Sequence, residues 1–128
     1  MGEDMAENGM AVSAGALDGV RVLDFTSVMA GPFATRMLAD LGAQVIKVES
    51  LEGDQVRARP PLREGFSAYF GNLNAGKQSI ACNLKSPEMV ALIKQMVANC
   101  DVLVENFRPG VMQRFGLDYA TLQDINPR

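Results

Sequence analysis

The chain has 128 residues, of which 48% are hydrophobic and 21% charged, as expected for a single globular domain. Its net charge of −3 argues against a dedicated nucleic-acid-binding protein, which normally carries a basic excess. The sequence contains no histidine and only two cysteines, so zinc sites and His-based acid–base or triad chemistry are excluded within it, and we expect no metal.

Much of the negative charge lies near the start of the chain. From Gly19 onward, eleven acidic residues stand against twelve basic ones, so the folded part could hold a modestly basic anion site. Residues 1–16 lack the apolar run of a secretory signal, and we expect them to form a flexible tail. No apolar run reaches 18 residues, so we expect no membrane span and no membrane partner. Two cysteines make no disulfide framework, which favours a cytoplasmic location.

The first fifty residues predict a strand, a helix and a second strand. Residues 20–25 (VRVLDF) indicate a buried strand, and Gly31-Pro32 is typical of a helix start. Gly42 is a suitable helix end, and residues 45–48 (VIKV) predict the next strand, which ends at Glu49. A strand, a helix and a strand within about thirty residues predict parallel pairing with a right-handed crossover.

Residues 50–78 interrupt this alternation. We expect a long irregular segment there, with one helical turn near residues 67–70. The alternation resumes with a strand at 79–83, a helix capped by Ser86 and a strand at 102–104. Two short helices are predicted at 111–115 and 119–125. The predicted fold is α/β, with a Rossmann-like, open and mostly parallel sheet across residues 17–128.

Two signatures of nucleotide binding fail on inspection. The turn after the first strand lacks the G-x-G-x-x-G pattern, so Glu49 is a poor candidate for holding a dinucleotide ribose. Residues 71–78 (GNLNAGKQ) resemble a phosphate-binding loop, but Gln78 replaces the Ser or Thr that would hold magnesium. A predicted strand also follows that segment where a helix is needed, so we interpret the match as coincidence.

Several other residues have an ordinary structural interpretation. Cys82 and Cys100 are expected to be buried packing residues. Asp24, at the end of the first strand, is expected to hydrogen-bond neighbouring loop backbone. Basic residues follow predicted strands at Lys85, Arg108 and Arg114, where an open sheet binds its ligands. The pattern alone leaves two interpretations open, an anion site or scattered surface charge, and it favours the second.

A series of motifs in a fixed order carries a family resemblance. The blocks are LDGVRVLDFT (17–26), AGPFAT (30–35), LADLGA (38–43), VIKVE (45–49), KQSI (77–80), LKSPE (84–88), DVLVENFRPGV (101–111), GL (116–117) and INPR (125–128). Together they resemble the N-terminal part of the family III CoA-transferases, the carnitine dehydratase and bile-acid-inducible F group.

The resemblance implies a function. Members of this family transfer CoA between carboxylic acids, or racemise and isomerise acyl-CoA esters, and their chains form interlocked homodimers. It implies acyl-CoA and an acceptor acid as substrates, with no tightly bound cofactor. The CoA contacts that it implies are Met29, Ala30, Lys85, Asn106, Phe107, Arg108 and Arg114. Lysine and arginine would neutralise the phosphates of CoA.

Two departures from the family pattern matter. Met29 stands where formyl-CoA transferases hold glutamine, which favours a bulkier or less polar acyl group. The nucleophilic aspartate of the family, which forms an aspartyl-CoA intermediate, is expected beyond Arg128, so no catalytic residue is assigned. The alternatives are an α-methylacyl-CoA racemase of the same superfamily, or a non-catalytic CoA-binding module.

Overall fold

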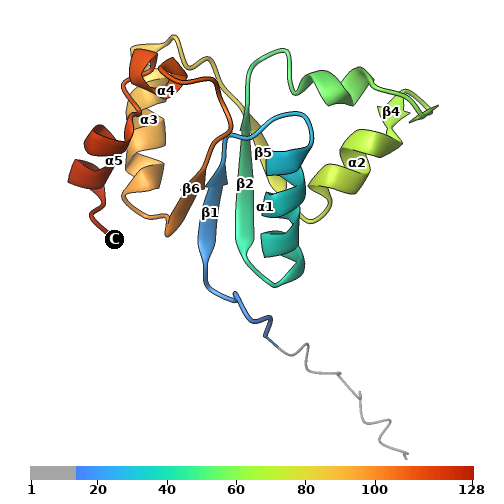
Figure 1. The fold of residues 1–128 in the computed structure, drawn as a ribbon, viewed down its shortest axis with the longest axis horizontal. Coiled ribbons are helices and arrows are strands. Elements are labelled where there is room, and N and C mark those ends of the chain that lie inside the picture. Colours follow the sequence, from blue (N-terminus) through green and yellow to red (C-terminus); the bar gives the residue numbers. More distant parts are fainter. Residues whose placement is uncertain (1–13) are drawn as a thin grey trace, which may run out of the picture.

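A computed structural model describes residues 14–128 of the chain and shows a four-stranded parallel sheet (Figure 1). The predicted tail lies almost entirely in residues 1–13, outside the described residues. The strands stand in the order β5-β2-β1-β6. Their bounds are Arg21–Asp24 (β1), Gln44–Glu49 (β2), Gln78–Ala81 (β5) and Val102–Val104 (β6). Every neighbouring pair is parallel, which confirms the predicted α/β class.

Helices cover both faces of the sheet. In Figure 1, α1 and α2 lie on one side of it, and α3, α4 and α5 lie on the other. Their bounds are Ala30–Asp40 (α1), Ala68–Asn74 (α2), Pro87–Val97 (α3), Val111–Arg114 (α4) and Tyr119–Ile125 (α5). The predicted helices are confirmed to within a few residues. The sheet is therefore doubly wound, and its carboxyl ends share one edge.

Alternation along β1 divides the core between the two faces. Val22 packs with Ala43 and Val45 beneath α1. Leu23 belongs to the larger cluster on the α3 side, with Ile93 and other residues of α3. Successive side chains of a strand point to opposite faces, so one strand supplies both cores. Fully burying each such aliphatic side chain contributes roughly 1.5–3 kcal/mol.

The segment expected to be irregular contains more structure than the sequence suggested. It holds a 3₁₀ helix, η1 (Gln55–Ala58), and a small hairpin formed by β3 (Leu62–Arg63) and β4 (Phe66–Ser67). Side-chain caps stabilise η1 and the start of α2. The Asp54 carboxylate accepts a hydrogen bond from the Val56 N–H, and the Ser67 hydroxyl oxygen accepts one from the Phe70 N–H. These elements are too short to leave a periodic pattern in the sequence.

The strand predicted at residues 79–83 ends earlier, at Ala81. Its last partner in the ladder is Glu49, the final residue of β2. Beyond that point the chain has no strand to pair with, so Cys82 to Lys85 form a loop at the sheet edge. This correction places Lys85 in the loop at the carboxyl end of β5, where a ligand can reach it.

Candidate binding site at the carboxyl edge of the sheet

A cleft of about 540 Å³ opens at the carboxyl ends of the parallel strands. Loops after β1, β2, β5 and β6 all contribute to its walls. Its size falls within the range of small-molecule sites, and its position is the usual ligand position of an open α/β sheet. Strand polarity therefore explains why residues distant in the sequence meet there.

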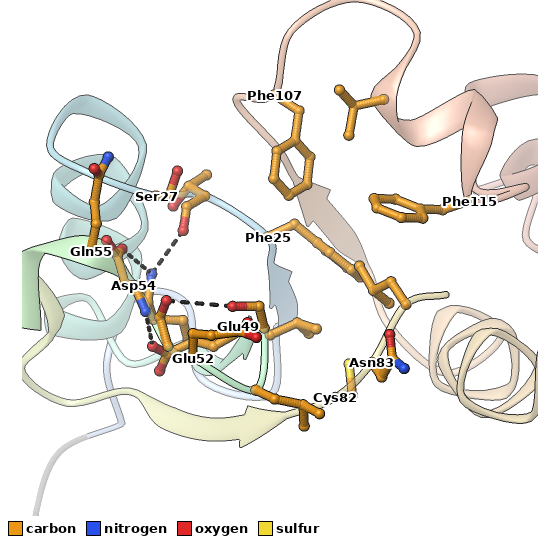
Figure 2. A pocket seen from close by; sticks show the side chains of 18 of the residues that line it. Phe25, Ser27, Glu49, Glu52, Asp54, Gln55, Cys82, Asn83, Phe107 and Phe115 are labelled. Atoms are coloured by element: carbon orange, nitrogen blue, oxygen red, sulfur yellow. Dashed lines mark hydrogen bonds and ion pairs between the residues drawn. The ribbon is translucent and has the colours of Figure 1, made fainter. Parts of the chain in front are cut away.

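The two walls of the cleft differ in chemistry. Figure 2 shows Phe25, Phe107 and Phe115 on one side. The opposite side carries acidic side chains, among them Glu49 and Asp54. The aromatic wall can pack against an apolar or aromatic part of a ligand. The acidic wall would repel an anionic ligand unless its charges are compensated.

Both of these carboxylates are compensated by partners within the protein. Asp54 pairs with the Lys47 ammonium at 3.1 Å, and both side chains are 1% exposed. Glu49 accepts hydrogen bonds from Arg57, from the Ser79 hydroxyl and from the Asp54 N–H. Burial raises the pKa of Glu49, but these hydrogen bonds and the Arg57 charge outweigh it and lower the pKa to about 2. The Glu49 carboxylate is thus hydrogen-bonded within the protein, which agrees with the interpretation that it does not hold a dinucleotide ribose.

Lys77, the lysine of the segment that resembles a phosphate-binding loop, is also hydrogen-bonded within the protein. Its ammonium donates to the Asp24 carboxylate at 2.9 Å, to the Thr35 hydroxyl at 2.7 Å and to the Asn74 side chain at 2.9 Å. The side chain is 1% exposed. Burial lowers the pKa of Lys77, and Asp24 opposes that shift. The coincidence inferred from the sequence is therefore confirmed.

Asp24 has the structural role predicted for it. Its carboxylate accepts hydrogen bonds from the Thr26 N–H at 2.9 Å and from the Thr35 hydroxyl at 2.6 Å. The residue is fully buried. Within residues 14–128, no buried side-chain nitrogen or oxygen lacks a hydrogen-bond partner. The polar interior under the cleft is accordingly a completed network, as a stable fold requires.

A second, shallower hollow adjoins the cleft and is lined by cations. Lys85, Lys94 and Arg114 all contribute to it, and no acidic residue does. The two hollows share Leu84, Lys85 and Phe115, so they adjoin each other. Three cations without an intervening acid favour an anionic group such as a phosphate.

The structure places the seven expected contact residues in different surroundings. Lys85 and Phe107 line the cleft, and Arg114 lines the cationic hollow. Asn106 pairs with the backbone of Ser27 through two hydrogen bonds of 2.9 Å. Met29, Ala30 and Arg108 are exposed beside the cleft but line neither hollow.

Sequence reasoning missed Lys94 and the pair formed by Lys47 and Asp54. Lys94 shares one face of α3 with Pro87 and Ala91, which its helical spacing could have indicated. Lys47 lies within an apolar strand, and a buried lysine in a strand always needs a partner. That partner, Asp54, lies outside the strand in an irregular segment, so no periodicity pointed to it.

Three further observations on the described residues concern the cysteines, metal-binding clusters and membrane-crossing helices. Cys82 and Cys100 are buried free thiols, as predicted, and burial raises the pKa of both. No cluster of three or more metal-binding side chains occurs in residues 14–128. In the same range, no helix has the length and apolar character that crossing a membrane requires.

The fold and this site define a Rossmann-like α/β protein with a two-part candidate site at the carboxyl edge of its sheet. The model of CoA-transferase family III matches residues 17–128. The chain belongs to that family, which confirms the resemblance inferred from its motifs.

Two relatives with assigned activities are CoA-transferases. The chain is 50% identical over 113 residues to the succinyl-CoA:glutarate CoA-transferase of Mus musculus, a match that covers 87% of this chain and 26% of the relative. It is 47% identical over 125 residues to the acetyl-CoA:oxalate CoA-transferase of Acetobacter aceti, a match that covers 97% of this chain and 32% of the relative.

A solved structure agrees with these sequence matches. A CAIB/BAIF family protein from Brucella suis superimposes with a TM-score of 0.83 at 42% identity, over 88% of this chain and 31% of that one. The chain thus spans about a third of the length of these proteins.

Proposed function

We propose that the chain supplies much of the CoA site of an acyl-CoA:carboxylate CoA-transferase. The observation that carries the proposal is that the aromatic cleft adjoins the cationic hollow at Lys85 and Phe115. CoA has an elongated shape, with a phosphorylated nucleotide at one end and a largely uncharged pantetheine arm. The cationic hollow suits the phosphates, and the aromatic cleft suits the less polar part.

In this proposal Lys85, Lys94 and Arg114 bind the phosphates, and Phe107 packs against the ligand in the cleft. Met29 and Ala30, at the start of α1, contact the thioester end, and Arg108 assists from the cleft rim. The CoA donor is an acyl-CoA thioester, and the acceptor is a carboxylic acid. The similarity to a glutarate and an oxalate CoA-transferase favours a dicarboxylate acceptor.

The proposed covalent step uses an aspartate outside these 128 residues. Its carboxylate attacks the thioester carbonyl, the C–S bond breaks, and CoA leaves as a thiolate from a mixed anhydride. The thiolate then attacks the aspartyl carbonyl and releases the donor acid, which leaves an aspartyl-CoA thioester. The acceptor carboxylate repeats the sequence in reverse. We also propose an interlocked homodimer in the cytoplasm for the full-length protein, on the family resemblance.

Binding to three ligands tests the site. We expect CoA to bind the full-length protein more tightly than dephospho-CoA, and pantetheine to bind weakest. Changing Lys85, Lys94 or Arg114 to alanine should each weaken CoA binding by about tenfold, the loss typical of one charge-assisted hydrogen bond. Arg63→Ala, in the exposed hairpin, is the matched control and should bind normally. Equal affinity of the alanine variants and the control for CoA would contradict the site.

The reaction class needs a separate assay. We expect the full-length protein to exchange CoA between an acyl-CoA and a free dicarboxylic acid. Deuterium incorporation at the α-carbon without an acceptor acid would instead identify the racemase alternative. CoA binding with neither reaction would favour a non-catalytic module.

A further inference from the structure

The loop between β1 and α1 is held by side chains from several segments of the chain. Three successive residues, Thr26 to Val28, have five backbone polar groups engaged in this way. The Thr26 N–H donates to the Asp24 carboxylate (2.9 Å), and the Thr26 carbonyl accepts from the Lys47 ammonium (2.7 Å). The Ser27 N–H donates to the Asn106 side chain, and the Ser27 carbonyl accepts from it (2.9 Å each). The Val28 N–H donates to the Asp54 carboxylate (3.3 Å). Backbone hydrogen bonds usually go to other backbone groups, so this arrangement fixes an irregular loop without a ladder.

Val28 shows that the loop conformation is imposed from outside. Its φ angle is 71°, in the left-handed region that β-branched residues strongly disfavour. Without external contacts, valine would leave this conformation for the extended or right-handed region. Backbone strain of this kind persists only when the surrounding structure fixes it. The next residues, Met29 and Ala30, are the ones assigned to the thioester end of CoA.

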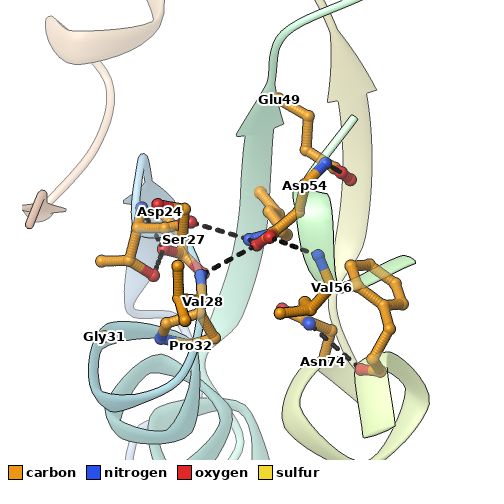
Figure 3. A network of polar contacts seen from close by, with 12 residues as sticks. Asp24, Ser27, Val28, Gly31, Pro32, Glu49, Asp54, Val56 and Asn74 are labelled. Carbon is orange, nitrogen blue, oxygen red and sulfur yellow. Dashed lines mark hydrogen bonds and ion pairs between the residues drawn. The ribbon is translucent and has the colours of Figure 1, made fainter. Parts of the chain in front are cut away.

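Asp54 is the side chain that joins this loop to the rest of the site. One carboxylate oxygen accepts from the Val28 N–H and from Lys47 Nζ, and the other accepts from the Val56 N–H (Figure 3). Lys47 in turn donates to the Thr26 carbonyl. A buried ion pair adds little net stability compared with apolar packing, because desolvation offsets its attraction. This pair instead fixes the position of the β1–α1 loop relative to residues 50–58.

We infer that Asp54, with Lys47, is a positioning residue that holds Val28 in its left-handed conformation and so presents Met29 and Ala30 to CoA. This inference rests on the proposed CoA site for its functional consequence. Its structural part concerns the loop alone and is tested without a ligand.

The first test measures the loop directly. In the full-length protein, Asp54→Asn should speed amide hydrogen exchange in the peptide containing Ser27 and Val28. Asp118→Asn is the matched control, because Asp118 accepts from the Thr121 N–H at 3.1 Å much as Asp54 accepts from Val56. The control should leave the β1–α1 loop unchanged. Unchanged exchange in the loop of the Asp54→Asn protein would overturn the inference.

The second test is a double-mutant cycle with coenzyme A as the ligand. Asp54→Asn should weaken CoA binding by about tenfold, as expected when a buried hydrogen-bonded contact is lost. The same change should cost clearly less in a Val28→Gly background, because glycine adopts the left-handed conformation without strain. A purely structural role for Asp54 predicts an equal loss in both backgrounds, and that result would overturn the inference.

The two tests separate failure of the inference from failure of the proposed function. If the unmodified protein does not bind CoA, the proposed function is wrong and the exchange test still decides the role of Asp54. If Asp54→Asn does not fold, Asp54→Glu replaces it in both assays. Glutamate keeps a carboxylate opposite Lys47 but moves it by one methylene, so the same direction of change is expected. Normal exchange and unchanged CoA affinity in the glutamate variant would contradict the inference.

Discussion

At the scale of single residues, the charged side chains fall into two groups: those paired within the protein interior and those that line the hollows and could bind a ligand. Asp24, Lys47 and Lys77 are almost completely buried and paired within the protein. Lys85 and Arg114 line hollows and are not among the ion-paired residues of the described chain. The two groups look alike in the sequence, since each contains basic residues in or near strands. Burial alone distinguishes them.

Glu49 predicts a pH dependence of stability. Its pKa is about 2 in the folded state against an ordinary value of 4.5, so its contribution is fully present above pH 4.5 and is lost as the pH falls towards 2. The shift corresponds to about 3 kcal/mol. We expect Glu49→Gln to destabilise the full-length protein at pH 7, with a difference from the unmodified protein that shrinks between pH 5 and 2. Chemical denaturation across this range measures it, and a pH-independent difference would contradict the assignment.

The cysteines predict low thiol reactivity. Cys82 and Cys100 are buried, and burial raises the pKa of both thiols, so at neutral pH they are protonated and shielded. We expect iodoacetamide to leave both unmodified in the native protein at pH 7 and to modify both in denaturant. Peptide mass spectrometry reads each site separately. Rapid native labelling of Cys82 would show that the cleft floor opens.

At the scale of elements, short capping signals predict helix starts better than they predict the irregular segment. Ser86 and Pro87 begin α3 where the sequence placed it, and the Asp118 carboxylate caps α5. Between β2 and β5, however, η1 is capped by the Asp54 side chain, and β3 and β4 pair over only two residues each. Residues of this segment, including Asp54, line the cleft, so the least predictable part of the fold contributes directly to the site.

The α3 cap predicts a modest loss of stability. Ser86→Ala removes the hydroxyl that accepts from the Met89 N–H, which should cost about 1 kcal/mol. Gln95→Ala, on the exposed side of the same helix, is the control and should change little, because alanine is a good helix former. Thermal unfolding of both variants in the full-length protein measures the difference. Equal melting temperatures would mean that the cap contributes nothing.

At the scale of the whole molecule, the chain leaves apolar surface uncovered. Met29, Phe33, Met37 and Leu41 recur every four residues along α1, and each is about half exposed. Repetition at this spacing gathers them on one side of the helix. An apolar stripe of this length is unusual for a monomeric domain. The chain also spans only about a third of the length of its relatives.

This stripe predicts the behaviour of the 128-residue chain expressed alone. We expect it to self-associate, with an unfolding transition that depends on concentration, because association removes the stripe from water. Phe33→Gln with Met37→Gln should reduce the association. Arg63→Gln, a change on the hairpin, should not. Sedimentation across a concentration series measures it, and a monomer with cooperative, concentration-independent unfolding would contradict the prediction.

The sequence by itself determined the alternation of strands and helices, the parallel sheet and the family, because hydrophobic periodicity and ordered motifs are local properties of the chain. It also determined that the dinucleotide and phosphate-loop signals were false, since both depend on local context. Only the tertiary structure decided which charges are buried, because the partners of Lys47 and Lys77 come from other segments. It alone joined Lys85, Lys94 and Arg114 in one hollow and linked Asp54 to Val28, since such contacts between distant residues leave no periodic trace in the sequence.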